Sequence, residues 1–266
     1  MDYKLALITG ASSGIGKEFA YKLASEKINL ILVARNKQKL KEVSKEIELK
    51  FKVKTHIIVA DLLKKEDINK VFLKSNKIGK VDLLINNAGF GSWGEYNKLD
   101  LNNELNMIEL NVKTVYFFTR QYLEKMESYS KPAGIINVAS VAGILPSPLY
   151  ANYGATKAYV RQLTEAVQFE LKEKKNKNVK LMILSPGMVE TNFSKIAMHD
   201  KFAKDPFKGM KAKDVVNIAW KDFLKSKKES MPGIENKLYN LVNKLSRTIT
   251  AKGLYKTLSK FIEGKK

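Results

Sequence analysis

The chain has 266 residues, of which 44% are hydrophobic, and this is enough to bury a core and to exclude a disordered chain. It contains no cysteine, which excludes disulfides, thiolate metal ligands and a cysteine nucleophile, and its only histidines are His56 and His199, so no metal site is expected. Its 48 lysine and arginine residues against 27 acidic residues give a formal charge of +21, which raises nucleic acid, anionic lipid and acidic proteins as partners.

The composition of the positive charge favours a solvated surface over a nucleic-acid interface. Only four of the 48 basic residues are arginine, the side chain that binds phosphate with two hydrogen bonds, and the others are lysine. The lysines are scattered among glutamates, as over residues 36–50, and do not form one patch. No nucleic-acid partner is therefore expected.

The N-terminal residues run directly into an apolar segment and lack the pattern of a targeting sequence. No stretch approaches the roughly 18 apolar residues that a membrane span needs. These two observations predict a cytoplasmic protein.

Short, almost continuously apolar runs alternate with helical patterns along the chain. Strands are predicted at 5–9, 29–34, 54–60, 83–86, 134–138 and 179–184. Helices are predicted at 15–26, 37–49, 65–78, 101–126 and 153–174. Runs without polar alternation are typical of strands buried on both faces, and alternation with helices predicts a doubly wound parallel sheet of the Rossmann type. Without a repeat or linker, residues 1–266 are predicted to form one domain.

A glycine-rich turn follows the first predicted strand and precedes the first predicted helix. It reads Thr9-Gly10-Ala11-Ser12-Ser13-Gly14-Ile15-Gly16, with the spacing G-x-x-x-G-x-G. Glycines allow a sharp turn and let backbone N–H groups approach a pyrophosphate at the helix N-terminus. The turn therefore predicts a dinucleotide-binding site.

Further motifs occur in order after this turn. They are Asp61 after the third strand, Asn86-Asn87-Ala88-Gly89 at the fourth, Asn111 within a helix, Ser140 at the end of the fifth, Tyr153 and Lys157 as Y-x-x-x-K, Pro186-Gly187 after the sixth, and Thr191. Together they resemble the short-chain dehydrogenase/reductase family over about residues 3–195. Tyr153 and Lys157 also stand four residues apart, which places them on one helix face.

The expected chemistry is reduction of a carbonyl group. Its oxygen gains negative charge and needs a proton donor, the role predicted for Tyr153. The Lys157 ammonium is expected to lower the tyrosine pKa, and Ser140 to donate a hydrogen bond to the same oxygen. The resemblance implies that Lys157 also holds the nicotinamide ribose and that Asn111 anchors a water relay.

The end of the second strand predicts NADP(H) rather than NAD(H) as cofactor. Arg35 stands there in place of a carboxylate and can bind a 2′-phosphate, with Ser12 nearby. The resemblance implies that Asp61 meets adenine and that residues 87–89 line the far side of the cofactor. The predicted cofactor-binding set is Gly10, Ser12, Ser13, Gly14, Ile15, Gly16, Arg35, Asp61, Asn87, Ala88, Gly89, Tyr153, Lys157, Pro186, Gly187 and Thr191.

Apolar loops beyond the strand ends predict a hydrophobic carbonyl substrate, such as a 3-oxoacyl chain, a steroid or an aldehyde. The candidate segments are 141–148 and an apolar substrate lid at 188–211 without strand period, with Trp93 as a further candidate. Core packing explains any one of these residues equally well.

The C-terminal segment departs most from the family pattern, because Met231-Pro232-Gly233 stands where many members have a seventh strand. Residues 237–266 form a basic amphipathic extension with eight Lys or Arg residues and one Glu. A helix closing over the site and an oligomer contact are the favoured interpretations, and a peripheral membrane anchor is the less favoured one.

The sequence thus predicts an NADP(H)-dependent oxidoreductase of a hydrophobic carbonyl or secondary alcohol. The alternative is a non-catalytic NADP-binding regulator or interaction protein. The resemblance further implies a homodimer or homotetramer.

Overall fold

The computed structural model describes residues 3–191, 193, 209–236 and 246–262. The strands are β1 (Leu5–Thr9), β2 (Asn29–Ala34), β3 (Thr55–Val59), β4 (Leu83–Asn86), β5 (Ala133–Val138), β6 (Val179–Leu184), β7 (Val189–Glu190), β8 (Met210–Lys211) and β9 (Glu229–Ser230). The α-helices are α1 (Gly14–Ser25), α2 (Lys37–Phe51), α3 (Lys65–Ile78), α4 (Leu101–Ile108), α5 (Thr114–Glu127), α6 (Ala151–Glu173), α8 (Ala212–Leu224) and α10 (Arg247–Ile262). Short helical turns are η1 (Tyr96–Lys98), η2 (Glu109–Lys113) and η3 (Val141–Gly143).

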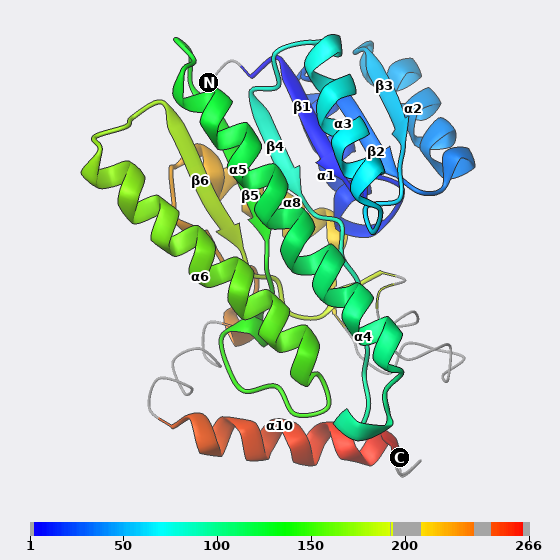
Figure 1. Ribbon diagram of the computed structural model, residues 1–266, viewed down its shortest axis with the longest axis vertical. Helices are drawn as coiled ribbons and strands as arrows, with labels where there is room; N and C mark the ends of the chain where they lie inside the picture. The colour runs from blue at the N-terminus through cyan, green and yellow to red at the C-terminus, as the bar shows by residue number, and fades with distance from the viewer. Residues whose placement is uncertain (1–2, 192, 194–208, 237–245, 263–266) are drawn as a thin grey trace.

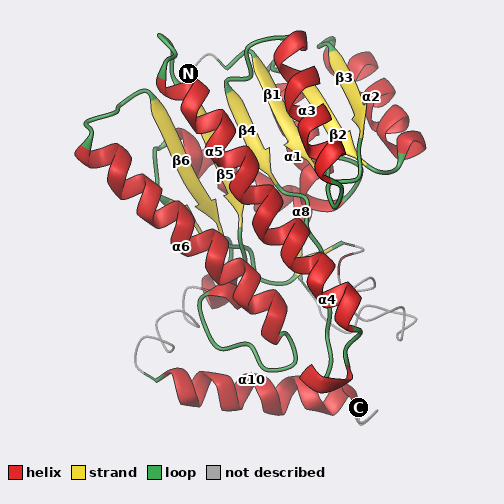
Figure 2. Cartoon of the chain, in the orientation of Figure 1, coloured by secondary structure: helices red, strands yellow, loops and turns green. Residues whose placement is uncertain are grey.

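Seven parallel strands form one sheet in the order β3-β2-β1-β4-β5-β6-β9, with helices on both faces (Figure 1, Figure 2). The order reverses between β1 and β4, where a ligand crevice forms in doubly wound sheets. The predicted fold class is confirmed.

Both faces of the sheet are buried, which explains the continuous apolar runs in the strands. Ala6 and Ile8 of β1 belong to a core shared with α1, α2 and α8. Leu5 and Leu7 belong to the opposite core, shared with α3, α5 and α6. Alternate residues of one strand thus enter two different hydrophobic cores, and neither face can tolerate polar alternation.

The six predicted strands are confirmed to within a residue at each end. The absence of a seventh strand was a wrong prediction, because β9 pairs in parallel with β6 just before Met231. A strand of two residues is too short to show a hydrophobic pattern. The prediction of no strand within 188–211 was also wrong, since β7 and β8 pair through Val189 with Met210 and Glu190 with Lys211.

Two helices differ from the prediction. The single helix expected at 101–126 is divided by η2, one turn of π-helix at Glu109–Lys113. Helix α8 was missed, although Val215, Val216, Ala219, Trp220 and Phe223 follow helical spacing and are buried.

Candidate functional site

The glycine-rich turn joins β1 to α1 and requires glycine for geometric reasons. Gly10 and Gly14 have φ angles of 67° and 54°, which L side chains rarely adopt. A Cβ added to Gly10 would lie 2.7 Å from Asn87 Nδ2, and one added to Gly16 would overlap the Gly10 carbonyl oxygen. The turn is therefore packed against both the start of α1 and the end of β4.

The N-terminus of α1 is left open for an anion. Ser13 is the N-cap but its side chain makes no capping hydrogen bond, and the first turn carries no acidic residue. The first N–H groups of a helix need an outside acceptor, and the helix dipole favours a negative charge there. A pyrophosphate fits this position. Gly14 also faces Thr191, whose Cγ2 would lie 3.2 Å from an added Cβ, so these two predicted cofactor residues are neighbours.

Thr9 ties the end of β4 to the glycine turn. Its hydroxyl oxygen accepts hydrogen bonds from Asn87 N at 2.9 Å and Ala88 N at 3.0 Å, while Asn87 Nδ2 donates to Thr9 O at 2.9 Å. These bonds fix the predicted residues Asn87 and Ala88 beside Gly10. Sequence reasoning did not assign Thr9 to the site, although its place as the last residue of β1 was a usable signal.

The predicted adenosine side lies at the ends of β2 and β3. Ala11 N donates to Val33 O at 3.1 Å, so Ser12 and Arg35 each extend from the same edge of the sheet, and the Arg35 side chain is exposed. Asp61 is half-buried and its Oδ1 accepts from Leu63 N at 3.2 Å. The residues proposed for the 2′-phosphate and adenine are thus at neighbouring strand ends.

The predicted catalytic residues come together at the carboxyl ends of β4 and β5. Ser140 follows β5 and begins η3, where its hydroxyl oxygen accepts from Ala142 N at 3.1 Å. Its side chain also interacts with Tyr153, which lies in the first turn of α6, and acts to lower the pKa of that tyrosine. Lys157, one turn further along, is 4% exposed and lies 5.8 Å from the centre of the Tyr153 ring.

The ionisation of Tyr153 differs from the expectation. Burial raises the Tyr153 pKa to about 12, while the hydrogen bond with Ser140 acts in the lowering direction. Burial lowers the Lys157 pKa from 10.5 to about 8. The Lys157 ammonium donates to Val138 O at 2.9 Å and lies over the tyrosine ring. The predicted lowering of the tyrosine pKa by Lys157 is therefore not present in this structure, where desolvation dominates.

Asn111 lies in η2 and is fully buried. Its Nδ2 donates to Phe90 O at 2.8 Å and to Thr156 Oγ1 at 3.1 Å, and its Oδ1 accepts from Phe90 N at 3.1 Å. A Cβ on Gly89 would lie 2.7 Å from Asn111 Oδ1 and 3.5 Å from Lys157 Nζ. The π-turn thus brings Asn111 against the predicted cofactor residue Gly89 and the catalytic lysine.

Phe193, which lies within the predicted lid, and Gly91, which sequence reasoning did not assign, are neighbours of Tyr153. The rings of Tyr153 and Phe193 have centroids 5.3 Å apart, and Gly91 lies between them, because an added Cβ would be 3.2 Å from Tyr153 and 2.8 Å from Phe193. Neither residue belongs to the motifs that carry the resemblance, and spacing alone does not bring 91 and 193 together. They add an apolar wall beside the proposed proton donor.

On the opposite side, Pro186 O accepts hydrogen bonds from Val141 N at 3.0 Å and Ser140 Oγ at 3.4 Å. Gly187 packs against Asn236, whose side chain an added Cβ would overlap. The predicted lid at 188–211 is described only at its ends, and most of it, with His199, lies outside the described residues. Trp93, a substrate candidate, is 5% exposed.

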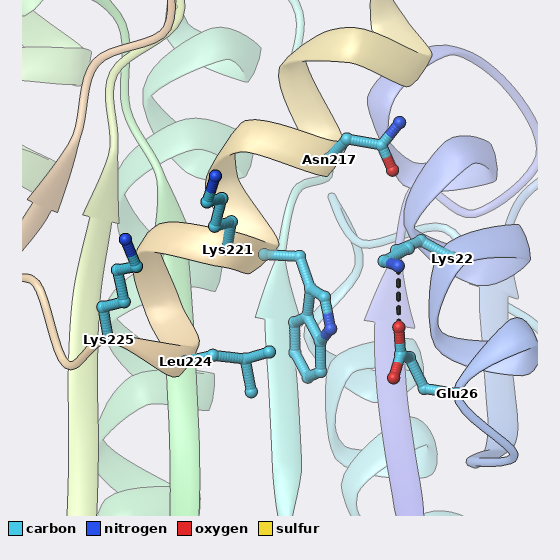
Figure 3. Close-up of a pocket in the computed structure, with 7 residues that line it drawn as sticks. Lys22, Glu26, Asn217, Lys221, Leu224 and Lys225 are labelled. Atoms are coloured by element: carbon cyan, nitrogen blue, oxygen red, sulfur yellow. Dashed lines mark hydrogen bonds and ion pairs between the residues drawn. The ribbon is translucent and has the colours of Figure 1, made fainter.

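A surface pocket of about 470 Å³ lies between α1 and α8 (Figure 3). It is lined by Lys22, Glu26, Asn217, Trp220, Lys221, Leu224 and Lys225, with an ion pair of 2.7 Å between Lys22 and Glu26. None of the predicted site residues lines it, so it is separate from the candidate active site.

Comparison with known proteins identifies the family. The model of the short chain dehydrogenase family matches residues 4–201. The chain belongs to this family.

Curated relatives align over most of this chain. A very-long-chain 3-oxoacyl-CoA reductase of Danio rerio is 37% identical over 198 residues, which are 73% of this chain and 62% of that protein. An uncharacterized oxidoreductase of Staphylococcus epidermidis is 36% identical over 193 residues, 71% of this chain and 79% of that protein. The chain thus spans less than two thirds of the reductase's length.

Solved structures share the fold over almost the whole chain. A bulky-bulky ketone specific alcohol dehydrogenase from Comamonas testosteroni is 25% identical with a TM-score of 0.78, covering 94% of this chain and 95% of that one. A short-chain dehydrogenase from Sphingobium yanoikuyae in complex with NADPH has a TM-score of 0.80 at 24% identity, covering 93% and 95%. A dehydrogenase/reductase from Burkholderia phymatum in complex with NAD has a TM-score of 0.77 at 25% identity, covering 86% and 89%.

Among the described helices, none is long and apolar enough to cross a membrane.

Proposed function

We propose that the protein is an NADP(H)-dependent oxidoreductase that interconverts a hydrophobic carbonyl compound and its alcohol. The convergence of Ser140, Tyr153, Lys157 and Asn111 beside the open N-terminus of α1 carries this proposal. The reductase and ketone-specific dehydrogenase among the relatives support the same reaction class. A non-catalytic role needs none of the four side chains.

The reaction requires a hydride donor, which the reduced nicotinamide supplies when bound. Tyr153 donates the proton to the carbonyl oxygen, and its raised pKa keeps the hydroxyl protonated at neutral pH. Ser140 donates a hydrogen bond to the same oxygen as negative charge develops there. Ser140 is buried and Tyr153 is half-buried, and hydrogen bonds shielded from water in this way are stronger than in water.

Lys157 returns the proton to Tyr153, and Asn111 anchors the water relay that resupplies it. The Lys157 pKa of about 8 makes this ammonium ready to release and regain a proton near neutral pH. Asn111 is fixed by its hydrogen bonds to the Phe90 backbone and to Thr156, and both Asn111 and Lys157 border Gly89. We assign Asn111 as the anchor of this proton path and Lys157 as its inner member and as the ribose contact.

NADP(H) is the proposed cofactor because Arg35 is exposed at the end of β2, where NAD-dependent Rossmann proteins have a carboxylate. Ser12 extends from the adjacent strand end and supplies a second donor for the 2′-phosphate. The relatives crystallised with NADPH and with NAD show that the fold accepts both dinucleotides. In this protein we assign the preference for NADP(H) over NAD(H) to Arg35.

A hydrophobic substrate fits the apolar wall formed by Phe193 and Gly91 beside Tyr153. A 3-oxoacyl thioester is the first candidate, because a very-long-chain 3-oxoacyl-CoA reductase is among the relatives. Steroids and hydrophobic aldehydes are the other classes to test. Oxidation of NADPH should be followed with all three; absence of turnover with each would contradict the proposed function.

We also propose a homodimer or homotetramer formed through α4, α5 and α6. Large apolar side chains are exposed on these helices, namely Leu105, Ile108, Tyr116, Tyr159 and Phe169. Exposed apolar residues gathered on neighbouring helices are typical of protein interfaces. Light scattering on the purified full chain measures its mass, and a monomer at micromolar concentration would contradict the proposal.

A further inference from the structure

Helix α10 combines exposed apolar side chains with charged side chains that are all basic. Residues 246–262 contain Arg247, Lys252, Lys256 and Lys260 and no Asp or Glu. Ile249 and Tyr255 are 66% and 52% exposed, and Lys252 and Lys256 are exposed beside them. Two large apolar residues exposed beside lysines on this 16-residue helix make its outer surface a candidate for a contact.

These four side chains share one face of the helix. At 100° per residue, Ile249, Lys252, Tyr255 and Lys256 fall on the same side, while Thr250 points away from it and is 7% exposed. Ser246 fixes the start of the helix, since its hydroxyl accepts from Ile249 N at 3.3 Å. The outward face is therefore a defined strip of alternating apolar and cationic groups.

The strip lies at the end of the molecule that holds the candidate active site. Figure 1 shows α10 across the end toward which the carboxyl ends of β4, β5 and β6 point. The turn η1 lies at the same end, and its Tyr96 is 78% exposed.

We propose that the outward face of α10 docks on an anionic lipid surface. Lysine and arginine attract acidic headgroups, while isoleucine and tyrosine partition into the interfacial region. A second copy of α10 fits poorly, because two faces without acidic residues repel each other.

The proposal that the protein docks on lipid depends only on the outward face of α10. Docking would deliver membrane-dissolved carbonyl compounds to Tyr153, and this consequence rests on the proposed function. Vesicle binding is measured without turnover, so failure of docking and failure of catalysis are distinguishable.

The test is co-sedimentation of the full chain with phosphatidylcholine vesicles, with and without phosphatidylserine. Binding is expected to the mixed vesicles and to fall at high ionic strength. The double variant Lys252→Gln, Lys256→Gln should bind roughly 30-fold more weakly, since each lysine near an anionic surface contributes about fivefold. Ile249→Ser with Tyr255→Ser should lose at least tenfold.

Matched controls carry the same changes elsewhere. Lys172→Gln with Lys174→Gln removes two exposed charges from the end of α6, and Leu49→Ser with Leu73→Ser removes two exposed apolar side chains. These controls should bind like the unmodified protein. Equal loss in variants and controls, no binding to either vesicle, or a change of oligomeric mass caused only by the α10 variants would overturn the proposal.

Discussion

The side chain of Asn111 and the backbone of Phe90 are joined by two hydrogen bonds of 2.8 and 3.1 Å. One amide side chain therefore satisfies both backbone polar groups of a residue that follows β4. Because Gly89 packs against the same Asn111, this pair connects the π-turn to the predicted cofactor contact.

Replacing Asn111 with Leu should therefore lower stability as well as activity. The change leaves the Phe90 N–H and C=O groups without their partner, and the free energy of unfolding should fall by about 2 kcal/mol or more. Urea unfolding and steady-state kinetics measure the two effects. Asn106→Leu, at an exposed position of α4, is the control. Equal free energies of unfolding for the two variants would show that the hydrogen bonds between Asn111 and Phe90 do not contribute to stability.

Tyr153→Phe should reduce kcat for carbonyl reduction by about 10²- to 10⁴-fold, the range typical of losing a general acid. The ring and its contact with Phe193 remain, so the thermal unfolding temperature should change little. Tyr150→Phe is the control. The centroid of the Tyr150 ring lies 6.0 Å from that of Tyr153, and the change removes only the Tyr150 hydroxyl. Normal turnover of Tyr153→Phe rules out the proposed mechanism.

Lys157→Met should stabilise the protein at neutral pH. A folded-state pKa of about 8 against 10.5 unfolded means that, between these values, the unfolded chain binds a proton that the folded protein lacks. The charged Lys157 therefore costs the folded protein about 3 kcal/mol below pH 8, and this cost falls as pH rises and is gone above pH 10.5.

The stability advantage of the methionine variant should accordingly shrink as pH rises from about 7 to about 10. Urea unfolding across this range measures it, while activity should be lost throughout. A difference that is constant with pH would mean that the folded protein does not lower the lysine pKa.

Arg35→Ala should weaken the preference for NADPH over NADH roughly ten- to a hundred-fold, because a charge-assisted hydrogen bond contributes about 1.5–3 kcal/mol. The ratio of kcat/KM values for the two cofactors measures this. Arg120→Ala removes a remote exposed arginine on α5 and should leave the ratio unchanged. If neither the unmodified enzyme nor Arg35→Ala distinguishes the cofactors, Arg35 has no such role.

Gly134→Ala should destabilise the fold by about 1–3 kcal/mol, because the new methyl group would overlap the Phe223 ring, which packs directly on β5. Gly253→Ala adds a Cβ with no atom within 4 Å on α10, where alanine is favoured over glycine by up to about 1 kcal/mol. Urea unfolding of both variants should give shifts of opposite sign. A stable Gly134→Ala protein would show that α8 can move away from the sheet.

The parts of the fold that sequence patterns predicted are those with a local signal. Leu5 to Thr9 is apolar throughout because alternate residues enter two cores, and the glycine turn after it needs positive φ angles. The Ser140, Tyr153 and Lys157 positions followed from the resemblance, and the structure brings them together.

The missed parts depend on contacts between distant segments. The π-turn at Glu109–Lys113 has helical composition, and only a shift of hydrogen-bond register distinguishes it from the α-helix around it. β9 has two residues, and its pairing with β6 supplies what its sequence cannot show. Desolvation raises the pKa of Tyr153, whereas the sequence predicted that the pKa would be lowered. Packing by Phe193, 40 residues further along the chain, contributes to this burial.

The order β3-β2-β1-β4-β5-β6-β9 has a consequence for synthesis of the chain. β1, β2 and β3 are complete once residue 59 has left the ribosome, but the other edge of β1 stays open until residues 83–86 emerge. β6 in turn waits for residues 229–230. Such non-local parallel pairing gives a high contact order, so we expect slow folding, and the open edge of β1 makes the nascent chain dependent on protection from aggregation.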